Sequence, residues 1–353
     1  MSDFYLKDIE RIKEFLEIKG KKLLFYHTDS DGVCSGSLLM KFYPGFEPYP
    51  RRGPEVGERF AEFIIRKNPD AVAFFDLPVD QYWKAVTKIS KALPKSQIFI
   101  LDHHIPTKNL NSKKIIHVNP MFSKKLYLPT CYLIYKILKG LDKPMEDFLW
   151  IPAMGIIADR GLEDTKDFSR NFKKLYPDLI SKNPLESEIS NGIELISSAI
   201  TLKSTDGVKE VFEIILNAKS YKEFADVKRL KDYKEIVDRE IKRLVENFEK
   251  EKEYYPEKKL ILYVMKTNLS LASTISNIIS DKNPDKVVII ANPSPEGHKI
   301  SLRSQKGKVN VGLLAKKCTK KIGSGGGHEQ AAGAFVKNFD LFKKRVLREL
   351  GKK

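Results

Sequence analysis

Three short segments, far apart in the chain, are dense in groups that bind metal ions or phosphate. The first covers residues 27–32 (HTDSDG), the second residues 102–104 (DHH) and the third residues 325–328 (GGGH). Four of the six histidines lie in these segments. Carboxylates and imidazoles are ligands of divalent cations, whereas successive backbone amides beside an imidazole suit a phosphate. The combination predicts a metal-assisted reaction at a phosphate group.

Alternating side chains in the first segment favour a metal site. His27, Asp29 and Asp31 follow an apolar run, and alternate residues of extended backbone share one face, so these three ligands point the same way. Gly32 then permits a tight turn into the next helix. The pattern partly matches a calcium-binding loop, but Leu38 stands where that loop needs a bidentate Glu. A second interpretation stays open, in which Asp31 caps a helix and His27 is a surface residue.

The second segment, Asp102-His103-His104, follows a buried apolar run and is the stronger candidate. Neutral imidazole binds Mn, Fe, Co and Zn ions, and a neighbouring carboxylate commonly fixes its tautomer. Adjacent side chains after a strand point to opposite sides, so we expect one histidine to bind a metal and the other to face the substrate. A turn that carries two polar residues is the alternative.

Two single aspartates complete the ligand set. Asp76 and Asp159 each stand at the end of a predicted strand or helix, where an isolated Asp is more often a cap or turn residue. With the residues above they make four carboxylates and two imidazoles, a set that suits two divalent cations with a bridging carboxylate. Such ligands without thiolate favour Mn²⁺ or Mg²⁺ over structural zinc. Two ions of this kind can generate hydroxide and stabilise an in-line phosphoryl displacement.

Glycines 325–327 and His328 form the third candidate, a cradle of backbone amides for phosphate within a predicted Gly-rich turn. The segment is neither a Walker loop nor the G-x-G-x-x-G dinucleotide fingerprint. Ser301 and Arg303 lie on one face of a preceding predicted strand, and Arg suits bidentate contact with phosphate. Without these neighbours, a flexible turn would be the better interpretation of the glycines.

The elements that position these residues follow from the apolar pattern. Short apolar runs alternate with helical patterns in the first 160 residues, which is typical of a buried parallel sheet. Acidic or imidazole residues follow three of the runs, at the strand ends where open α/β sheets bind ligands. The runs cover residues 22–26, 71–75, 97–101 and 115–118.

We therefore predict an α/β protein with a parallel-sheet N-terminal domain, a helical and charged connector, and a smaller C-terminal α/β domain. Residues 233–252 predict a long amphipathic helix, and strand and helix patterns alternate again from residue 258. A length of 353 residues favours two folded domains, with one large domain as the alternative. The predicted boundaries are 1–165, 166–256 and 257–353.

Composition bounds the class of protein. Sixty-three Lys and Arg against 46 Asp and Glu leave a net charge of +17, which favours nucleic acid as a partner; a Lys-rich solvated surface is the alternative. No apolar run approaches the roughly 18 residues of a membrane span, and the charged, helix-patterned first 20 residues are not a secretory signal. Three widely spaced cysteines fit neither a disulfide framework nor a zinc ribbon. We expect a cytoplasmic protein without membrane contact.

Five motifs together resemble the DHH phosphoesterase superfamily with a DHHA1-type C-terminal domain. The motifs are, in order, HTDSDG, FFDLP, LDHHIP, GIIADRG and GGGHEQAAG. They span both predicted domains, and within the superfamily the chain looks like archaeal RecJ-like nucleases and nanoRNase-type enzymes. The second motif departs from the common pattern, because Leu77-Pro78 follows its Asp where Leu-Gly is commoner.

The resemblance implies a role for each candidate residue. For two Mn²⁺ ions, or Mg²⁺ in their place, the implied ligands are His27 and Asp29 on one ion, Asp31, His103 and Asp159 on the other, and Asp76 between them. The implied catalytic residues are Asp102, which would orient His103, His104, which would face the scissile phosphate, and Arg303 and His328 in the second domain. The implied grip on substrate phosphates comes from Ser301, Arg303, Gly325, Gly326, Gly327 and His328.

Three functions follow as expectations. The leading one is a Mn²⁺-dependent exonuclease that hydrolyses single-stranded DNA, RNA or both through a two-metal hydroxide mechanism. The second is a nanoRNase that cleaves short oligonucleotides, or a phosphatase of cyclic dinucleotides or 3′-phosphoadenosine phosphate. The third is a non-catalytic scaffold of a replication complex. Membership of a replication or repair complex, or of a homo-oligomer, is compatible with activity.

Overall fold

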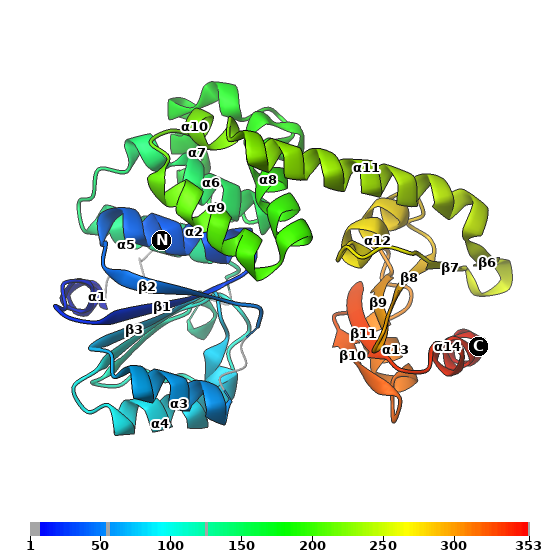
Figure 1. Cartoon of the computed structure of the whole chain (residues 1–353), viewed down its shortest axis with the longest axis horizontal. Helices are drawn as coiled ribbons and strands as arrows, with labels where there is room; N and C mark the ends of the chain where they lie inside the picture. Colours follow the sequence, from blue (N-terminus) through cyan, green and yellow to red (C-terminus); the bar gives the residue numbers. More distant parts are fainter. Residues whose placement is uncertain (1–7, 54–56, 124–125, 352–353) are drawn as a thin grey trace. The chain divides into compact units, whose positions relative to one another are not determined.

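The structure is a computed structural model of the chain and describes residues 8–53, 57–123 and 126–351. Of the helix-patterned N-terminus, residues 1–7 lie outside this description, and α1 covers Ile9–Leu16. The chain divides into two compact units, residues 1–234 and 235–353, each built around its own sheet (Figure 1). The domain boundaries predicted at residues 165 and 256 stay predictions.

The sheet of the first unit has five parallel strands. They are β1 (Lys22–His27), β2 (Phe46–Arg51), β3 (Ala71–Phe75), β4 (Gln97–Leu101) and β5 (Ile115–Val118). Their order is β2-β1-β3-β4-β5, and the four predicted strands are all present. The apolar pattern does not predict β2, because Pro48 and Pro50 lower its strand propensity. Proline is tolerated there because β2 lies at the edge of the sheet.

Both faces of this sheet are buried, which explains its continuous apolar runs. The covering helices are α2 (Ser30–Phe42), α3 (Glu58–Lys67), α4 (Trp83–Ala92), α5 (Thr130–Gly140) and α6 (Trp150–Ala158). Side chains alternate, so that Leu24 and Tyr26 pack on one face and Leu23 and Phe25 on the other. Helices α2 and α5, with α6 packed on both, cover the first face, and α3 and α4 cover the second (Figure 1).

The strand order places the predicted ligands at a switch point of the sheet. The connection after β1 runs through α2 on one face, whereas the connection after β3 runs through α4 on the other. The crevice between the carboxyl ends of β1 and β3 is therefore the expected ligand position for this order. His27 ends β1, Asp76 follows β3, and Asp102 follows β4.

Helices dominate residues 161–256, as the charge and periodicity predict. They are α7 (Lys166–Leu175), α8 (Glu188–Lys203), α9 (Thr205–Asn217), α10 (Tyr221–Ala225) and α11 (Lys228–Glu251). Helices α8 and α9 pack on α6 and α2 and share the apolar core of the first unit. The amphipathic helix predicted over residues 233–252 is observed as α11. Among the helices that the structure describes, none combines the length and apolarity needed to cross a membrane.

The second unit has a six-stranded mixed sheet. Its strands are β6 (Glu253–Tyr255), β7 (Leu260–Val264), β8 (Val287–Ser294), β9 (Gly297–Arg303), β10 (Gly323–Gly327) and β11 (Ala331–Val336). Its helices are α12 (Ala272–Asp281), α13 (Val311–Cys318) and α14 (Phe339–Leu350). The strand order is β10-β11-β9-β8-β7-β6, with β7 and β8 parallel and the other pairs antiparallel. The predicted fold class, α/β with a parallel N-terminal sheet and a smaller C-terminal α/β part, is confirmed.

The Gly-rich segment is a strand and not the predicted turn. β10 pairs antiparallel with β11, so that Gly323 lies opposite Val336 and Gly327 opposite Ala332. A Cβ at Gly323 would lie 1.9 Å from the carbonyl oxygen of Phe335, so the strands approach more closely there than a side chain allows. Glycine marks close backbone approach within a sheet as well as turns, and local sequence does not distinguish the two.

Candidate metal centre

The carboxyl end of β1 and the start of α2 supply the first ligands. Nδ1 of His27 lies 2.6 Å from Oδ2 of Asp29 and 3.3 Å from Oδ2 of Asp76. Oδ1 of Asp29 accepts a hydrogen bond from the backbone N–H of Gly32 at 3.0 Å, so Asp29, and not Asp31, caps α2. The cap fixes one oxygen of Asp29 and leaves the other facing His27.

Gly32 permits the turn that brings strand and helix together. A Cβ at this position would lie 2.4 Å from the backbone oxygen of His27. Any side chain would therefore push the start of α2 away from the end of β1. The tight turn predicted at Gly32 is confirmed, and it places Asp29 and His27 side by side.

A second group joins α2, α6 and the segment after β4. The ligand atoms of Asp31, His103 and Asp159 lie within 4.8 Å of one another. Asp31 is fully buried, and its carboxylate accepts hydrogen bonds from the backbone N–H of Thr130 at 2.7 Å and of Cys131 at 2.8 Å. These amides belong to the first turn of α5, whose positive end favours the carboxylate. Nε2 of His103 lies 3.4 Å from Oδ2 of Asp159.

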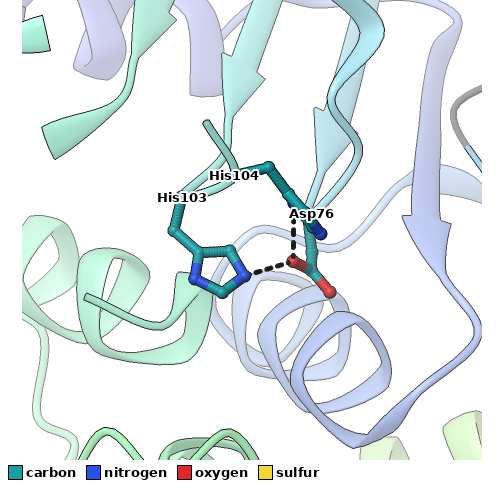
Figure 2. Close-up of side chains that lie close together, drawn as sticks. All are labelled: Asp76, His103 and His104. Atoms are coloured by element: carbon teal, nitrogen blue, oxygen red, sulfur yellow. Dashed lines mark ion pairs between the residues drawn. The ribbon is translucent and has the colours of Figure 1, made fainter. Parts of the chain in front are cut away.

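Asp76 lies between the two groups. Its Oδ1 is 3.1 Å from Nε2 of His103 (Figure 2). Its Oδ2 is 3.3 Å from Nδ1 of His27. The backbone of Asp76 is left-handed, with a φ of 58°, which Asp adopts more readily than most residues other than glycine. Its side chain is 1% exposed, and Oδ2 receives no aligned hydrogen bond from the residues that the structure describes. A buried carboxylate oxygen of this kind calls for a paired charge or a metal.

Asp102 pairs with His104, so the prediction that it orients His103 is wrong. Oδ1 of Asp102 lies 2.8 Å from Nδ1 of His104, and Asn119 donates a hydrogen bond to the backbone oxygen of His104 at 2.9 Å. The expectation that the two imidazoles point to opposite sides is also wrong, because both turn toward Asp76 (Figure 2). The reason is that β4 ends at Leu101, so strand alternation no longer applies to the histidines.

Crowding and burial raise the pKa values of three of the carboxyl groups, those of Asp31, Asp76 and Asp159. Burial, with the charge of Asp76, raises the pKa of Asp31 to about 7. Burial, with the charge of Asp31, raises the pKa of Asp159 to about 7. The pKa of Asp76 is raised by burial and by the charge of Asp29. A divalent cation at this position would remove the repulsion that these shifts reflect.

The histidines hold protons more tightly than usual. Burial lowers the pKa of His27, but the hydrogen bonds and charges of Asp29 and Asp76 outweigh it and raise the value to about 11. For His103, burial is outweighed by Asp76 and Asp31, and the pKa rises to about 10. Metal binding must displace these protons, so it is coupled to pH.

The donor set fits divalent metal ions. Among the residues that the structure describes, three groups have atoms close enough to hold an ion: His27 with Asp29 and Asp76, Asp31 with His103 and Asp159, and Asp76 with His103 and His104. Every ligand atom is a carboxylate oxygen or an imidazole nitrogen, the donors that Mn²⁺ accepts readily. The six residues predicted as metal ligands are therefore brought together, and their individual roles stay predictions.

Tyr127 belongs to the same site, although no motif marks it. Its hydroxyl donates a hydrogen bond to Oδ2 of Asp159 at 3.0 Å, and its ring centroid lies 4.8 Å from that of His103. The residue is 46% exposed, which is high for a large aromatic side chain. A single tyrosine in a loop carries no spacing signal, so only the folded structure connects it to the metal ligands.

In the second unit, Ser301 and Arg303 share one face of β9, as predicted. Arg303 donates from Nε to Oδ1 of Asn277 at 2.6 Å and from Nη2 to Oγ of Ser273 at 2.7 Å. It also donates from Nη1 to Oγ of Ser301 at 3.1 Å. Asn277 and Ser273 lie on α12, and the sequence offers no reason to single them out. Together these bonds hold the guanidinium in one position.

A groove of about 390 Å³ lies beside this cluster. Ser301, Arg303 and Gly327 line it together with residues 331–334 of β11. The other two glycines of the predicted cradle and His328 are not among its lining residues, and His328 is exposed. Of the predicted phosphate-binding residues, the structure thus brings three into one groove, whereas Gly325 and Gly326 lie elsewhere in the edge strand β10 and His328 follows it.

Residues 257–352 match the family model of the DHHA1 domain. Solved structures share the fold of nearly the whole chain at low identity. One, a DHH domain described as a member of the s1p family of ribosomal proteins, is 16% identical with a TM-score of 0.74 and aligns over 98% of this chain and 90% of its own. RecJ from Thermus thermophilus, solved in complex with Mn²⁺, is 16% identical with a TM-score of 0.70 over 98% of this chain. The alignment spans 54% of that RecJ, about half its length.

A pGpG-specific phosphodiesterase from Vibrio cholerae is 13% identical with a TM-score of 0.53, over 94% of this chain and 98% of its own. A comparison with curated protein sequences gives no match. Fold and site define the class, an α/β protein with the architecture of DHH-domain proteins. The DHHA1 match and these neighbours confirm the resemblance to the DHH superfamily.

Proposed function

We propose that the protein is a divalent-metal-dependent phosphodiesterase, a RecJ-like exonuclease that hydrolyses single-stranded DNA, RNA or both. The observation that carries the proposal is the convergence of carboxylates and imidazoles from three separate segments around the buried Asp76. The fold shared with a RecJ that was solved with Mn²⁺ supports both the reaction class and the metal. A net charge of +17 supports a polyanionic substrate.

The chain holds its proposed ligands in place through contacts of its own. When bound, a pair of divalent cations would lower the pKa of an attacking water and offset negative charge at the phosphate. Asp29 is oriented by the amide of Gly32, and Asp31 by the first turn of α5. Asp159 is oriented by the hydroxyl of Tyr127. Such preorganisation limits the movement that substrate binding would otherwise require.

His104 is the residue that we assign to the scissile phosphate. Because its Nδ1 is paired with Asp102, its Nε2 is the nitrogen left to meet a substrate. Burial lowers the pKa of His104, but the hydrogen bond and charge of Asp102 outweigh it and raise the pKa. The ring therefore keeps a second proton to higher pH than a free histidine does. A proton on Nε2 can bond a phosphoryl oxygen or pass to the leaving oxygen.

Arg303 is the residue that we assign to substrate phosphates in the DHHA1 domain. Its guanidinium is fixed by Asn277 and Ser273 and lines a groove with Ser301 and Gly327. A fixed guanidinium loses little conformational freedom when it binds a phosphate. Gly325, Gly326 and His328 would contribute further contacts to the same phosphates.

A second candidate is the hydrolysis of short substrates, in the manner of a nanoRNase or a dinucleotide phosphodiesterase. The fold shared with a pGpG-specific phosphodiesterase supports it. Both candidates use the same metal centre, so they differ in substrate length and not in chemistry.

Cleavage of labelled single-stranded DNA and RNA, each five or thirty nucleotides long, tests the proposal in the presence of Mn²⁺. The key variant is Asp76→Asn, which removes the carboxylate charge at the centre of the site. Asn has nearly the same side-chain shape as Asp and tolerates the positive φ of this position. Asp142→Asn is the matched control, because Asp142 also has a positive φ, of 53°, and is exposed.

We expect the original protein and the Asp142→Asn variant to degrade the thirty-nucleotide strands. The Asp76→Asn variant should not cleave them. Cleavage of the five-nucleotide strands alone would move the assignment to the short-substrate enzyme. Absence of Mn²⁺-dependent cleavage with every substrate would refute both and favour a non-catalytic scaffold.

A further inference from the structure

An aromatic groove lies beside the metal centre, on the face of the N-terminal sheet that α3 covers. Its volume is about 480 Å³, within the range of small-molecule sites. The side chains that line it include Phe25, Tyr49, Arg51, Arg59, Phe60 and Phe63. None of the proposed metal ligands or phosphate-binding residues is among them.

The aromatic rings at the groove pack against one another, and Lys67 lies over the rings of Tyr49 and Phe63. Phe25 and Tyr49 stack with centroids 5.2 Å apart and an interplanar angle of 23°. Phe60 meets Phe25 edge to face at 4.8 Å, and Phe63 lies nearly parallel to Phe60 at 6.4 Å. Tyr49, Phe60 and Phe63 are only partly buried, although they pack against the core. Partly exposed aromatic faces are the usual platforms for unstacked nucleobases.

Two arginines give the groove its charge. The guanidinium of Arg51 lies over the ring of Phe60, with its carbon 4.3 Å from the ring centroid. Arg59 is exposed at the first turn of α3. A groove lined by aromatic rings and arginines is complementary to a nucleotide, which has a flat base and an anionic phosphate.

The groove lies next to the proposed site of cleavage. Arg51 ends β2 and pairs in register with His27, which ends β1. Neighbouring strands are about 4.8 Å apart, so the backbone of Arg51 lies beside that of a proposed metal ligand. Phe25 is two residues before His27 and on the same side of the strand, which connects the aromatic groove to the metal centre.

We propose that this groove binds one nucleotide of a single-stranded nucleic acid, next to the phosphodiester at the metal centre. The base would stack on the rings around Phe60, and the exposed Arg59 would contact the phosphate. The inference rests on the proposed function for its substrate class and deepens it, because a nucleotide site beside the cleavage site favours strands longer than a dinucleotide.

Fluorescence anisotropy with labelled oligo-dT and oligo-U of twelve nucleotides, in the presence of a chelator, tests the groove without requiring cleavage. Phe60→Leu removes the flat face but keeps an apolar side chain in the core, and its melting temperature checks folding. Arg59→Gln removes one exposed charge. Arg170→Gln is the matched control, because Arg170 is an exposed arginine on another helix of the same unit, α7.

We expect Phe60→Leu to weaken binding about tenfold, a modest effect for loss of one stacked base. Arg59→Gln should weaken binding severalfold and lower the salt dependence by about one phosphate contact. Arg170→Gln should bind like the original protein. Equal binding by all four proteins, or no binding by the original protein, would refute the proposal that the groove binds a nucleotide. If the original protein binds the oligonucleotides and Phe60→Leu weakens that binding, but no Mn²⁺-dependent cleavage occurs, the proposed function is refuted. The proposal of a nucleotide site in the groove would remain.

Discussion

Replacing Asp159 by Asn should stabilise the metal-free protein while weakening its hold on metal. Asp159 ends α6, its side chain is 21% exposed, and burial together with the charge of Asp31 raises its pKa to about 7. Asn has nearly the same shape and can still accept the hydrogen bond from Tyr127. The substitution therefore removes a charge that the folded, metal-free protein accommodates poorly.

The size of the effect follows from the pKa of Asp159. A rise from 3.8 to about 7 corresponds to about 4 kcal/mol, since each tenfold change in proton affinity is worth ~1.4 kcal/mol. Part of the rise depends on Asp31, whose own proton equilibrium adjusts, so we expect a net gain of about 2 kcal/mol. For a unit of this size, that gain should raise the melting temperature by about 6 °C.

The stability of the metal-free protein should change with pH in a direction that the pKa of Asp159 determines. The folded protein binds the proton of Asp159 more tightly than the unfolded chain does, so the original protein loses stability as the pH rises from about 4 to about 7. The Asn variant lacks this loss. The melting temperatures of the original protein and the Asn variant should therefore coincide near pH 4. Above pH 7 the variant should melt higher by the full difference.

Thermal denaturation in a chelating buffer, at several pH values across this window and at pH 8, measures the effect. Asp164→Asn is the control, since Asp164 is exposed and nearby. Added Mn²⁺ should reverse the order, because a ligand at about 100 times its Kd stabilises the original protein by about 2.7 kcal/mol. A variant that melts no higher than the original protein at pH 8 without metal would refute the reasoning.

Three further outcomes are expected. Tyr127→Phe keeps the ring against His103 but loses the hydroxyl, so Mn²⁺ should bind about tenfold more weakly by calorimetry, and unchanged affinity would contradict the positioning role. Mn²⁺ binding at pH 7 should release more than one proton, because His27 and His103 have pKa values of about 11 and 10. Calorimetry in two buffers of different ionisation enthalpy counts those protons, and a count of zero would exclude the two histidines as ligands. Arg303→Lys cannot reproduce the pair of hydrogen bonds to Asn277 and Ser273, so it should raise KM about tenfold without changing Mn²⁺ affinity. A fall in kcat alone would argue against phosphate binding.

Much of the fold follows from local properties of the chain. The predicted strands at the centre of the first sheet and the long helix α11 were found because apolar periodicity depends only on neighbouring residues. The failures have local causes as well. The edge strand β2 was not predicted because it contains two prolines. The glycines of β10 were interpreted as a turn, whereas they allow two strands to approach closely.

The ligand chemistry was likewise determined by the sequence, since carboxylates and imidazoles after apolar runs predict a metal centre at the edge of a parallel sheet. Only the tertiary structure decided which atoms meet there. Asp102 pairs with His104 because the backbone leaves the strand after Leu101, and Tyr127 reaches Asp159 from a loop without any motif. Residue type and spacing are local, whereas these contacts depend on strand order and on the path of loops, which no short segment specifies by itself.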